Sequence, residues 1–178
     1  MTESTFATPP DIFLAAAESA GIAFESADLA RIGRYLELLY DANTRMNLTA
    51  IREPEEVWSR HVLDSLTLLP WVLEMREKIG ENMRLLDVGS GGGLPGLIIA
   101  CVQPDLSITL LETTGKKARF LAETAEALER TREEAAEALE RAQGEAAEAL
   151  ELTRKEAAEA LERARAEAAE ALERTREE

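Results

Sequence analysis

Apolar residues recur at helical spacing through the first 80 residues of the chain. The pattern predicts helices over residues 11–20, 27–42, 54–69 and 71–79, each bounded by proline, glycine or other turn-forming residues. Pro70 interrupts the third apolar stretch and separates it from the fourth. The N-terminal part of the protein is therefore predicted to be helical.

The hydrophobic period changes at residue 84. Residues 84–88 (RLLDV) and 107–112 (SITLLE) are short apolar runs typical of buried parallel strands. A glycine-rich loop over 89–96 follows the first run, and Pro95 suits the first turn of a helix that continues to Ala100. Another helix is predicted from Lys116. Strand, glycine loop, helix, strand and helix in this order begin a doubly wound α/β sheet.

From residue 123 the sequence repeats every 11 residues, with leucine in one fixed slot of each unit. Alanine and glutamate dominate the units, so one long helix over 116–178 is predicted, with Gly144 as its weak point. An 11-residue period favours a right-handed supercoil if the helix pairs. One leucine per three turns makes a thin apolar seam, so we expect a solvated helix or a weakly self-associating coiled coil. The predicted domains are an N-terminal helical extension (1–80), a strand-loop-helix-strand segment (81–122) and the helical repeat (123–178).

The net charge of −15, of which −9 falls in residues 123–178, disfavours spontaneous binding to RNA or to anionic lipid. The few basic residues that could contact phosphate are Arg45, Arg52, Arg60, Lys116, Lys117 and Arg119. One cysteine, no signal-peptide pattern and no apolar run of about 18–20 residues predict a cytoplasmic protein without a membrane partner.

The glycine loop carries the strongest chemical signal. Glycines let backbone approach a ligand closely, and the start of the following helix offers free N–H groups. Asp87, Gly89, Gly91 and Gly93 match the motif with which methyltransferases bind S-adenosylmethionine, but the same loop also satisfies the dinucleotide pattern G-x-G-x-x-G. Glu112 ends the second strand, where a carboxylate binds ribose hydroxyls in either class. The motif alone leaves both ligands open.

Four blocks together resemble a known family. They are NLTAI (47–51), RH with DSL (60–61 and 64–66), LLDVGSGGGLPGLIIA (85–100) and LLETTGKKARFL (110–121). Over residues 12–122 they resemble the RsmG family (glucose-inhibited division protein B), which methylates N7 of a guanosine in 16S rRNA. The resemblance implies a partial Rossmann-like methyltransferase fold after the helical extension, S-adenosylmethionine as cofactor, and 16S rRNA of the small ribosomal subunit as partner.

The resemblance also implies the site residues. Those expected at the methyl donor are Asp87, Gly89, Ser90, Gly91, Gly93, Leu94, Pro95 and Glu112. Those expected to position the donor or the RNA are Arg60, His61, Asp64, Ser65, Lys116 and Lys117. Guanine N7 has a lone pair and no proton, so alignment suffices and no catalytic acid or base is predicted. His61 and Asp64 lack a third ligand, so no metal site is predicted.

The remaining strands of the family's sheet are absent from the sequence, where the 11-residue repeat stands instead. We therefore expect weak or unmeasurable donor binding, and exposed apolar strand edges that favour association. Two hypotheses remain. The chain is an incomplete S-adenosylmethionine-dependent rRNA methyltransferase, or it is a non-enzymatic truncated or engineered chimera that carries a long helix. Only the first predicts saturable donor binding.

Overall fold

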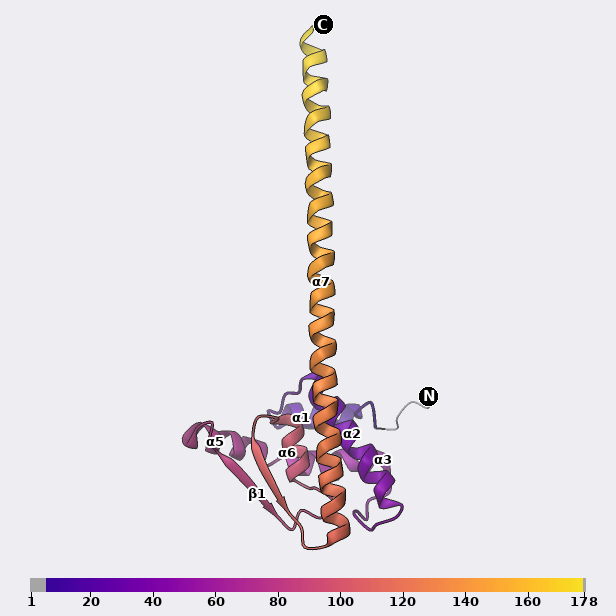
Figure 1. Cartoon of the computed structure of the whole chain (residues 1–178), viewed down its shortest axis with the longest axis vertical. Helices are drawn as coiled ribbons and strands as arrows, with labels where there is room; N and C mark the ends of the chain where they lie inside the picture. Colours follow the sequence, from indigo (N-terminus) through magenta and orange to yellow (C-terminus); the bar gives the residue numbers. More distant parts are fainter. Residues whose placement is uncertain (1–5, 178) are drawn as a thin grey trace. The chain divides into compact units, whose positions relative to one another are not determined.

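The computed structural model describes residues 6–177, and it describes the side chains of the C-terminal helix through residue 155 and over 157–159. The chain divides into two compact units, Met1–Glu133 and Glu134–Glu178. The elements, which Figure 1 shows, are α1 (Asp11–Ser19), α2 (Ser26–Asn43), α3 (Pro54–Val57), η1 (Trp58–Leu63), α4 (Asp64–Leu66), α5 (Leu69–Ile79), β1 (Arg84–Val88), α6 (Gly96–Val102), β2 (Ser107–Leu111) and α7 (Gly115–Glu177). The described residues thus form a mostly helical α/β structure.

The first unit contains a parallel pair of strands, β1 and β2, in register from Arg84 opposite Ser107 to Val88 opposite Leu111. Helix α6 makes the crossover between them, as the sequence predicted. Side chains alternate in burial along both strands, so one face of the pair is partly covered by helices. The other face leaves Leu86, Val88 and Leu111 more than half exposed.

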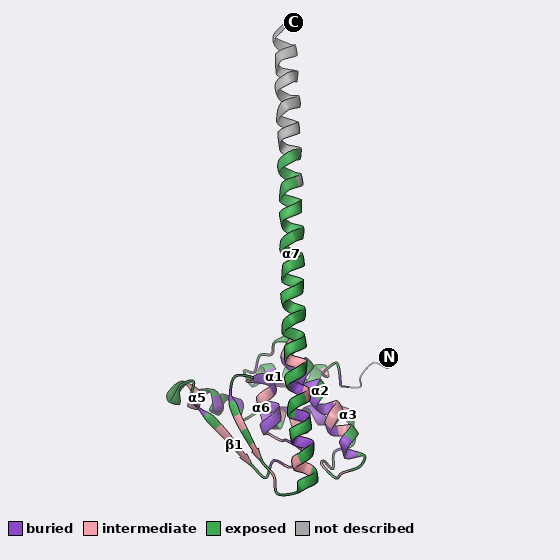
Figure 2. Cartoon of the chain, in the orientation of Figure 1, coloured by how far each residue is buried: buried purple, intermediate pink, exposed green. Residues whose placement is uncertain are grey.

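The N-terminal helices share one hydrophobic core with α6 and the first turns of α7. Phe13 of α1, Tyr35 of α2 and Trp58 of η1 belong to the same buried cluster as Leu97 of α6 and Phe120 of α7. Figure 2 shows the buried residues gathered where these helices meet. The helical layer is therefore part of the packing that supports the strand-loop-helix segment.

The third predicted helix differs in detail from a regular α-helix. Trp58–Leu63 forms a π-helical segment between two short α-helical pieces. A turn at Thr67 and Leu68 then interrupts the helix. Pro70 lies in the first turn of α5, where its missing N–H costs no helical hydrogen bond. Pro95 was predicted in the first turn of α6 but is the N-cap residue, one position before the helix begins.

Helix α7 begins at Gly115, one residue before the predicted start. Phe120, Leu121 and Leu128 on its first turns are buried in the core of the first unit. Every described side chain from Glu133 onward is exposed, including Leu139 and Leu150 of the repeat. These side chains lie on the surface of the chain, as expected for a solvated helix, while self-association of the repeat stays a prediction.

No helix within residues 6–177 is both long enough and apolar enough to cross a lipid bilayer.

Candidate functional site

The glycine loop leaves the carboxyl end of β1 and lies beside the carboxyl end of β2. Gly89, Gly91 and Gly93 have φ angles of 79°, 57° and 100°, which glycine adopts without the strain that a Cβ would bring. The Gly89 N–H donates to the Leu111 carbonyl oxygen at 2.8 Å, and the Gly93 N–H donates to the Ser90 carbonyl oxygen at 2.6 Å. The loop is thus a tight, internally bonded turn next to the ends of both strands.

Asp87 fixes the loop to the following helix. Its Oδ2 accepts the Gly96 N–H at 3.1 Å, while the buried Ser90 hydroxyl donates to the Asp87 carbonyl oxygen at 3.0 Å. The Leu97 N–H already donates to the Gly93 carbonyl oxygen at 2.7 Å. The expectation of free N–H groups at the start of this helix is therefore wrong for Gly96 and Leu97, because Asp87 of β1 and the Gly93 carbonyl group accept them.

Glu112 lies one residue beyond β2 and reaches the glycine loop. Its Oε2 accepts the Gly91 N–H at 3.0 Å, and its Oε1 accepts the Thr114 N–H at 2.7 Å. These hydrogen bonds, those from Thr114 most of all, hold the pKa of the Glu112 carboxyl below its usual value. An ionised carboxylate thus lies against the loop, 21 residues away from Gly91 in sequence.

The inner side of the loop packs on α2 through Gly92, a residue that the sequence analysis did not single out. The buried Tyr35 hydroxyl donates to the Gly92 carbonyl oxygen at 3.0 Å. Burial raises the pKa of Tyr35 well above its usual value, so the hydroxyl keeps its proton as a donor. A side-chain carbon at Gly92 would lie 3.1 Å from Leu39 Cδ1. The extra glycine between Gly91 and Gly93 was the available sequence signal for this close packing.

A second group of predicted residues meets the far end of the loop. Arg60, His61, Asp64, Ser65, Thr67, Leu68, Leu94 and Pro95 line one surface hollow. Arg60, His61, Asp64 and Ser65 are therefore neighbours of the loop residues Leu94 and Pro95. Lys116 and Lys117 do not line this hollow. They lie on the first turn of α7, where the charge of Lys117 helps to lower the pKa of Glu112.

His61 is held by a hydrogen bond between its Nε2 and the Thr49 hydroxyl, at 2.6 Å. Burial, and next the charge of Arg60, lower the pKa of His61, so the ring is neutral at pH 7. Asn43 in turn holds Thr49, because its amide bonds both the N–H and the carbonyl oxygen of that residue at 3.1 and 3.0 Å. Among the side chains that the structure describes, no three histidine, cysteine or acidic groups come together as metal ligands.

Two of the predicted phosphate contacts have acidic partners. Arg60 Nη1 lies 3.0 Å from Glu56, and Arg45 Nη2 lies 2.7 Å from Asp41, and both arginines are exposed. Such pairs offset much of the positive charge that an approaching phosphate would meet. Arg45 and Arg60 therefore offer little net attraction to RNA.

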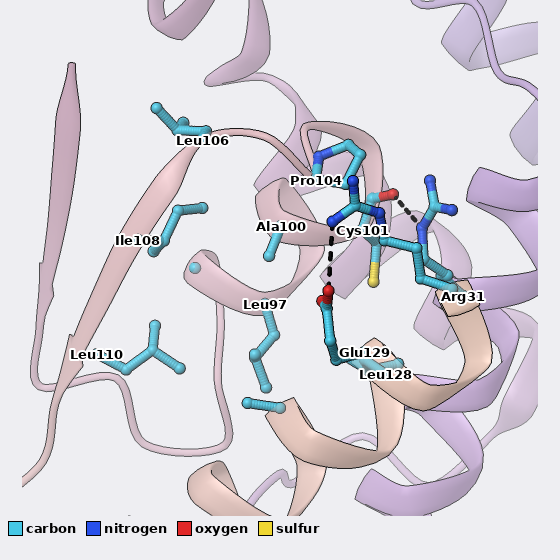
Figure 3. A pocket seen from close by; sticks show the side chains of 13 residues that line it. Arg31, Leu97, Ala100, Cys101, Pro104, Leu106, Ile108, Leu110, Leu128 and Glu129 are labelled. Atoms are coloured by element: carbon cyan, nitrogen blue, oxygen red, sulfur yellow. Dashed lines mark hydrogen bonds and ion pairs between the residues drawn. The ribbon is translucent and has the colours of Figure 1, made fainter. Parts of the chain in front are cut away.

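A separate apolar hollow lies between α6, β2 and the first turns of α7 (Figure 3). Its charged groups are already bonded, since Arg31 Nε donates to the Cys101 carbonyl oxygen at 2.8 Å and Arg132 pairs with Glu129 and Asp105. Burial raises the pKa of the Cys101 thiol to about 12, so this buried thiol keeps its proton at pH 7. The chemistry of the unit is concentrated at the glycine loop instead.

Comparison with known proteins agrees with the loop and its neighbours. The family model of rRNA small subunit methyltransferase G (GidB) matches residues 28–174, which is most of the chain. This protein belongs to the rRNA small subunit methyltransferase G family. The match to the family model runs further toward the C-terminus than the 12–122 expected from the four sequence blocks.

Individual members of the family match a shorter stretch. Ribosomal RNA small subunit methyltransferase G of Sorangium cellulosum is 48% identical over 124 residues, which cover 70% of this chain and 50% of that protein. The proteins of the same name from Pseudomonas aeruginosa (strain LESB58) and Xanthomonas campestris pv. campestris (strain B100) are 43% and 42% identical, over 60% and 68% of this chain and 47% and 54% of their own lengths. The chain thus spans about half the length of these methyltransferase G relatives.

Proposed function

We propose that the glycine loop binds S-adenosylmethionine and that the first unit is the donor-binding part of an rRNA methyltransferase with a partial Rossmann-like fold. The observation that carries this proposal is the Glu112 carboxylate, 3.0 Å from the Gly91 N–H at the carboxyl ends of two parallel strands. Ligands of open α/β sheets bind at this edge. Glu112 would accept the ribose hydroxyls of the donor, and the loop from Gly89 to Gly93 would lie along its methionine portion.

The residues present fit this ligand in two respects. An ionised carboxylate has about four lone-pair positions, so Glu112 retains acceptor capacity for a diol besides its bonds to Gly91 and Thr114. Gly89 has no atom within 4 Å of the place where a Cβ would stand, so its backbone faces open space. A ligand could therefore approach the Gly89 backbone closely. When bound, S-adenosylmethionine supplies a sulfonium methyl group for transfer to a nucleophile.

For the acceptor we propose N7 of a guanosine in 16S rRNA; the relatives are named as methyltransferases of small-subunit ribosomal RNA. This nitrogen attacks through its lone pair, so the protein need only hold acceptor and methyl group in line. Arg60, His61, Asp64 and Ser65 line the hollow beside Leu94 and Pro95, and we assign the positioning of the donor or the RNA to them. Lys116 and Lys117 would contact phosphate from the start of α7. Because ribosomal subunits are cytoplasmic, a protein that methylates them would act in the cytoplasm.

A second candidate is a non-enzymatic chain that carries a methyltransferase segment and a long helix. One observation favours it. Leu86, Val88 and Leu111 are exposed on one face of a two-stranded parallel sheet, although parallel sheets are ordinarily covered on both faces. Under this alternative the domain boundaries near residues 80 and 122 would remain, without donor binding.

Separate titrations with two ligands test the first proposal against the alternative that the loop binds a dinucleotide. Calorimetric titration of the whole chain with S-adenosylhomocysteine, the demethylated product, is expected to give weak, saturable binding, and NAD is expected to give none. Tritiated S-adenosylmethionine with 30S ribosomal subunits would then show whether bound donor is used. Binding of NAD alone, or of neither ligand, would contradict the proposed function.

A further inference from the structure

We propose that Tyr35 is a positioning residue for the glycine loop and acts through the carbonyl group of Gly92. This inference deepens the proposed function, since it assigns to α2 the control of the backbone that would face the donor. Tyr35 lies in the N-terminal helical layer, 57 residues before Gly92, and outside every motif of the loop.

The contact between Tyr35 and Gly92 is a buried hydrogen bond. Tyr35 has a relative exposure of 0%, and its hydroxyl donates to the Gly92 carbonyl oxygen at 3.0 Å. Gly92 is itself buried, so water cannot replace this donor without opening the packing. The ring meanwhile packs in the main hydrophobic core, which fixes the position of the hydroxyl.

Two apolar side chains complete the same contact. A Cβ on Gly92 would lie 3.1 Å from Leu39 Cδ1 and 3.5 Å from Leu48 Cβ. Leu39 is one helical turn beyond Tyr35 on α2, so both residues face the loop from one side of that helix. The helical layer thus holds Gly92 by one hydrogen bond and by close packing.

The planarity of the peptide bond extends the effect of Tyr35 into the loop. The carbonyl group of Gly92 and the N–H of Gly93 belong to one rigid plane, so fixing the carbonyl oxygen also fixes the direction of that N–H. The Gly93 N–H donates to the Ser90 carbonyl oxygen at 2.6 Å and closes the loop. The Ser90 carbonyl group shares its own peptide plane with the Gly91 N–H, which donates to Glu112. Rotation of the Gly92 carbonyl group would therefore break the bond from Gly93 to Ser90 and release the plane that carries the Gly91 N–H.

The chain offers a matched control on the same helix. The Tyr40 hydroxyl also donates to a backbone carbonyl oxygen at 3.0 Å, but this oxygen belongs to Ile51 and not to the loop. Tyr35→Phe and Tyr40→Phe each delete one hydroxyl and keep the ring. A second variant, Gly92→Ala, tests the packing contact without touching Tyr35.

Two measurements on the whole chain separate positioning from general stability. Amide hydrogen exchange of Gly93, normalised to the Leu36 amide in α2, is expected to accelerate about fivefold or more in Tyr35→Phe. The dissociation constant for S-adenosylhomocysteine is expected to rise roughly fivefold to tenfold in Tyr35→Phe, as for loss of one hydrogen bond. Gly92→Ala is expected to raise both the exchange rate of Gly93 and the dissociation constant. Tyr40→Phe is expected to change neither quantity.

Each outcome decides the inference. Unchanged Gly93 exchange in Tyr35→Phe, or an equal acceleration in Tyr40→Phe, would overturn it. If the parent chain binds no S-adenosylhomocysteine, the proposed function fails, and the exchange of Gly93 in the ligand-free protein alone decides the role of Tyr35. Binding by the parent with an unchanged dissociation constant in both Tyr35→Phe and Gly92→Ala would leave the function standing and reject the positioning role.

Discussion

At the scale of single residues, two carboxylates organise the glycine loop by accepting backbone N–H groups. Asp87 accepts from Gly96 and Glu112 accepts from Gly91, so each joins the loop to a different element. Both residues were expected at the donor from the family resemblance. Asp87 thereby joins β1 to α6, and Glu112 joins the end of β2 to the loop, while the contact of either carboxylate with the donor stays a prediction.

Replacement of Glu112 by glutamine is expected to weaken S-adenosylhomocysteine binding roughly tenfold, because a charge-assisted acceptor is lost. The lowered pKa of Glu112 adds a pH dependence. The carboxylate is ionised above its ordinary pKa of about 4.5, and its hold on the loop is lost only as pH falls through the lowered value. Calorimetry from pH 7.5 to 5 should therefore show no loss of affinity from this group.

Glu123→Gln is the matched control, since Glu123 is an exposed carboxylate on α7 and outside the loop. Equal affinities for the parent and for Glu112→Gln would show that Glu112 makes no contact with the donor.

Replacement of Gly96 by alanine is expected to lower the free energy of unfolding of the first unit by about 1–3 kcal/mol, because the site is overpacked. The added Cβ would lie 2.4 Å from Leu110 Cδ2 and 2.7 Å from Asp87 Oδ2. Urea unfolding followed by tryptophan fluorescence measures the change. A Cβ added at Gly144 would have no atom within 4 Å, so Gly144→Ala should leave the urea unfolding transition of the first unit unchanged. A Gly96→Ala protein as stable as the parent would contradict the close approach of α6 and β2.

At the scale of elements, the segment that follows α2 is ordered by one buried side chain. Asn43 Oδ1 accepts the N–H groups of Leu48 and Thr49 at 2.8 and 3.1 Å, and its Nδ2 donates to the Thr49 carbonyl oxygen at 3.0 Å. Thr49 in turn holds His61, and Leu48 packs beside Gly92. This short segment therefore connects the π-helical turn with the glycine loop.

Asn43→Ala is expected to cost about 2–3 kcal/mol of stability, because three hydrogen bonds of a nearly buried amide are lost. Asn47→Ala, an exposed asparagine in the same segment, should change stability by less than about 0.5 kcal/mol. Thermal unfolding of the two variants measures the difference. Equal melting temperatures would mean that Asn43 does not order the segment.

Elements with a clear local pattern were predictable from the sequence. The spacing of apolar residues gave β1 at residues 84–88 and placed α2 within one residue at each end. The π-helical turn was not predictable, because no residue in 58–63 forbids an ordinary α-helix and the choice depends on tertiary packing. The contact of Tyr35 with Gly92 joins positions 57 residues apart, so no local pattern reveals it.

At the scale of the whole molecule, the two units differ in what stabilises them. The first unit buries a core that includes Phe13, Tyr35 and Trp58, whereas the described side chains of the second are exposed. A helix without buried contacts is stabilised mainly by helix propensity and by pairs such as Glu137 with Arg141. The two units are thus expected to unfold differently.

On heating, the fluorescence of the two tryptophans should show one sharp transition, since Trp58 and Trp71 both lie in the first unit. Far-ultraviolet circular dichroism should add a broad, non-cooperative loss of helix from the second unit. Superimposable curves from the two probes would contradict independent stability of the units.

The central claim is that the glycine loop binds the methyl donor, and titration of the whole chain with S-adenosylhomocysteine tests it most directly. Gly91→Arg would fill the loop, while Gly21→Arg places the same residue at another positive-φ glycine, in open space outside the loop. We predict weak, saturable binding by the parent and by Gly21→Arg, and none by Gly91→Arg. No detectable heat from the parent up to millimolar ligand, or equal binding by both variants, would contradict the claim.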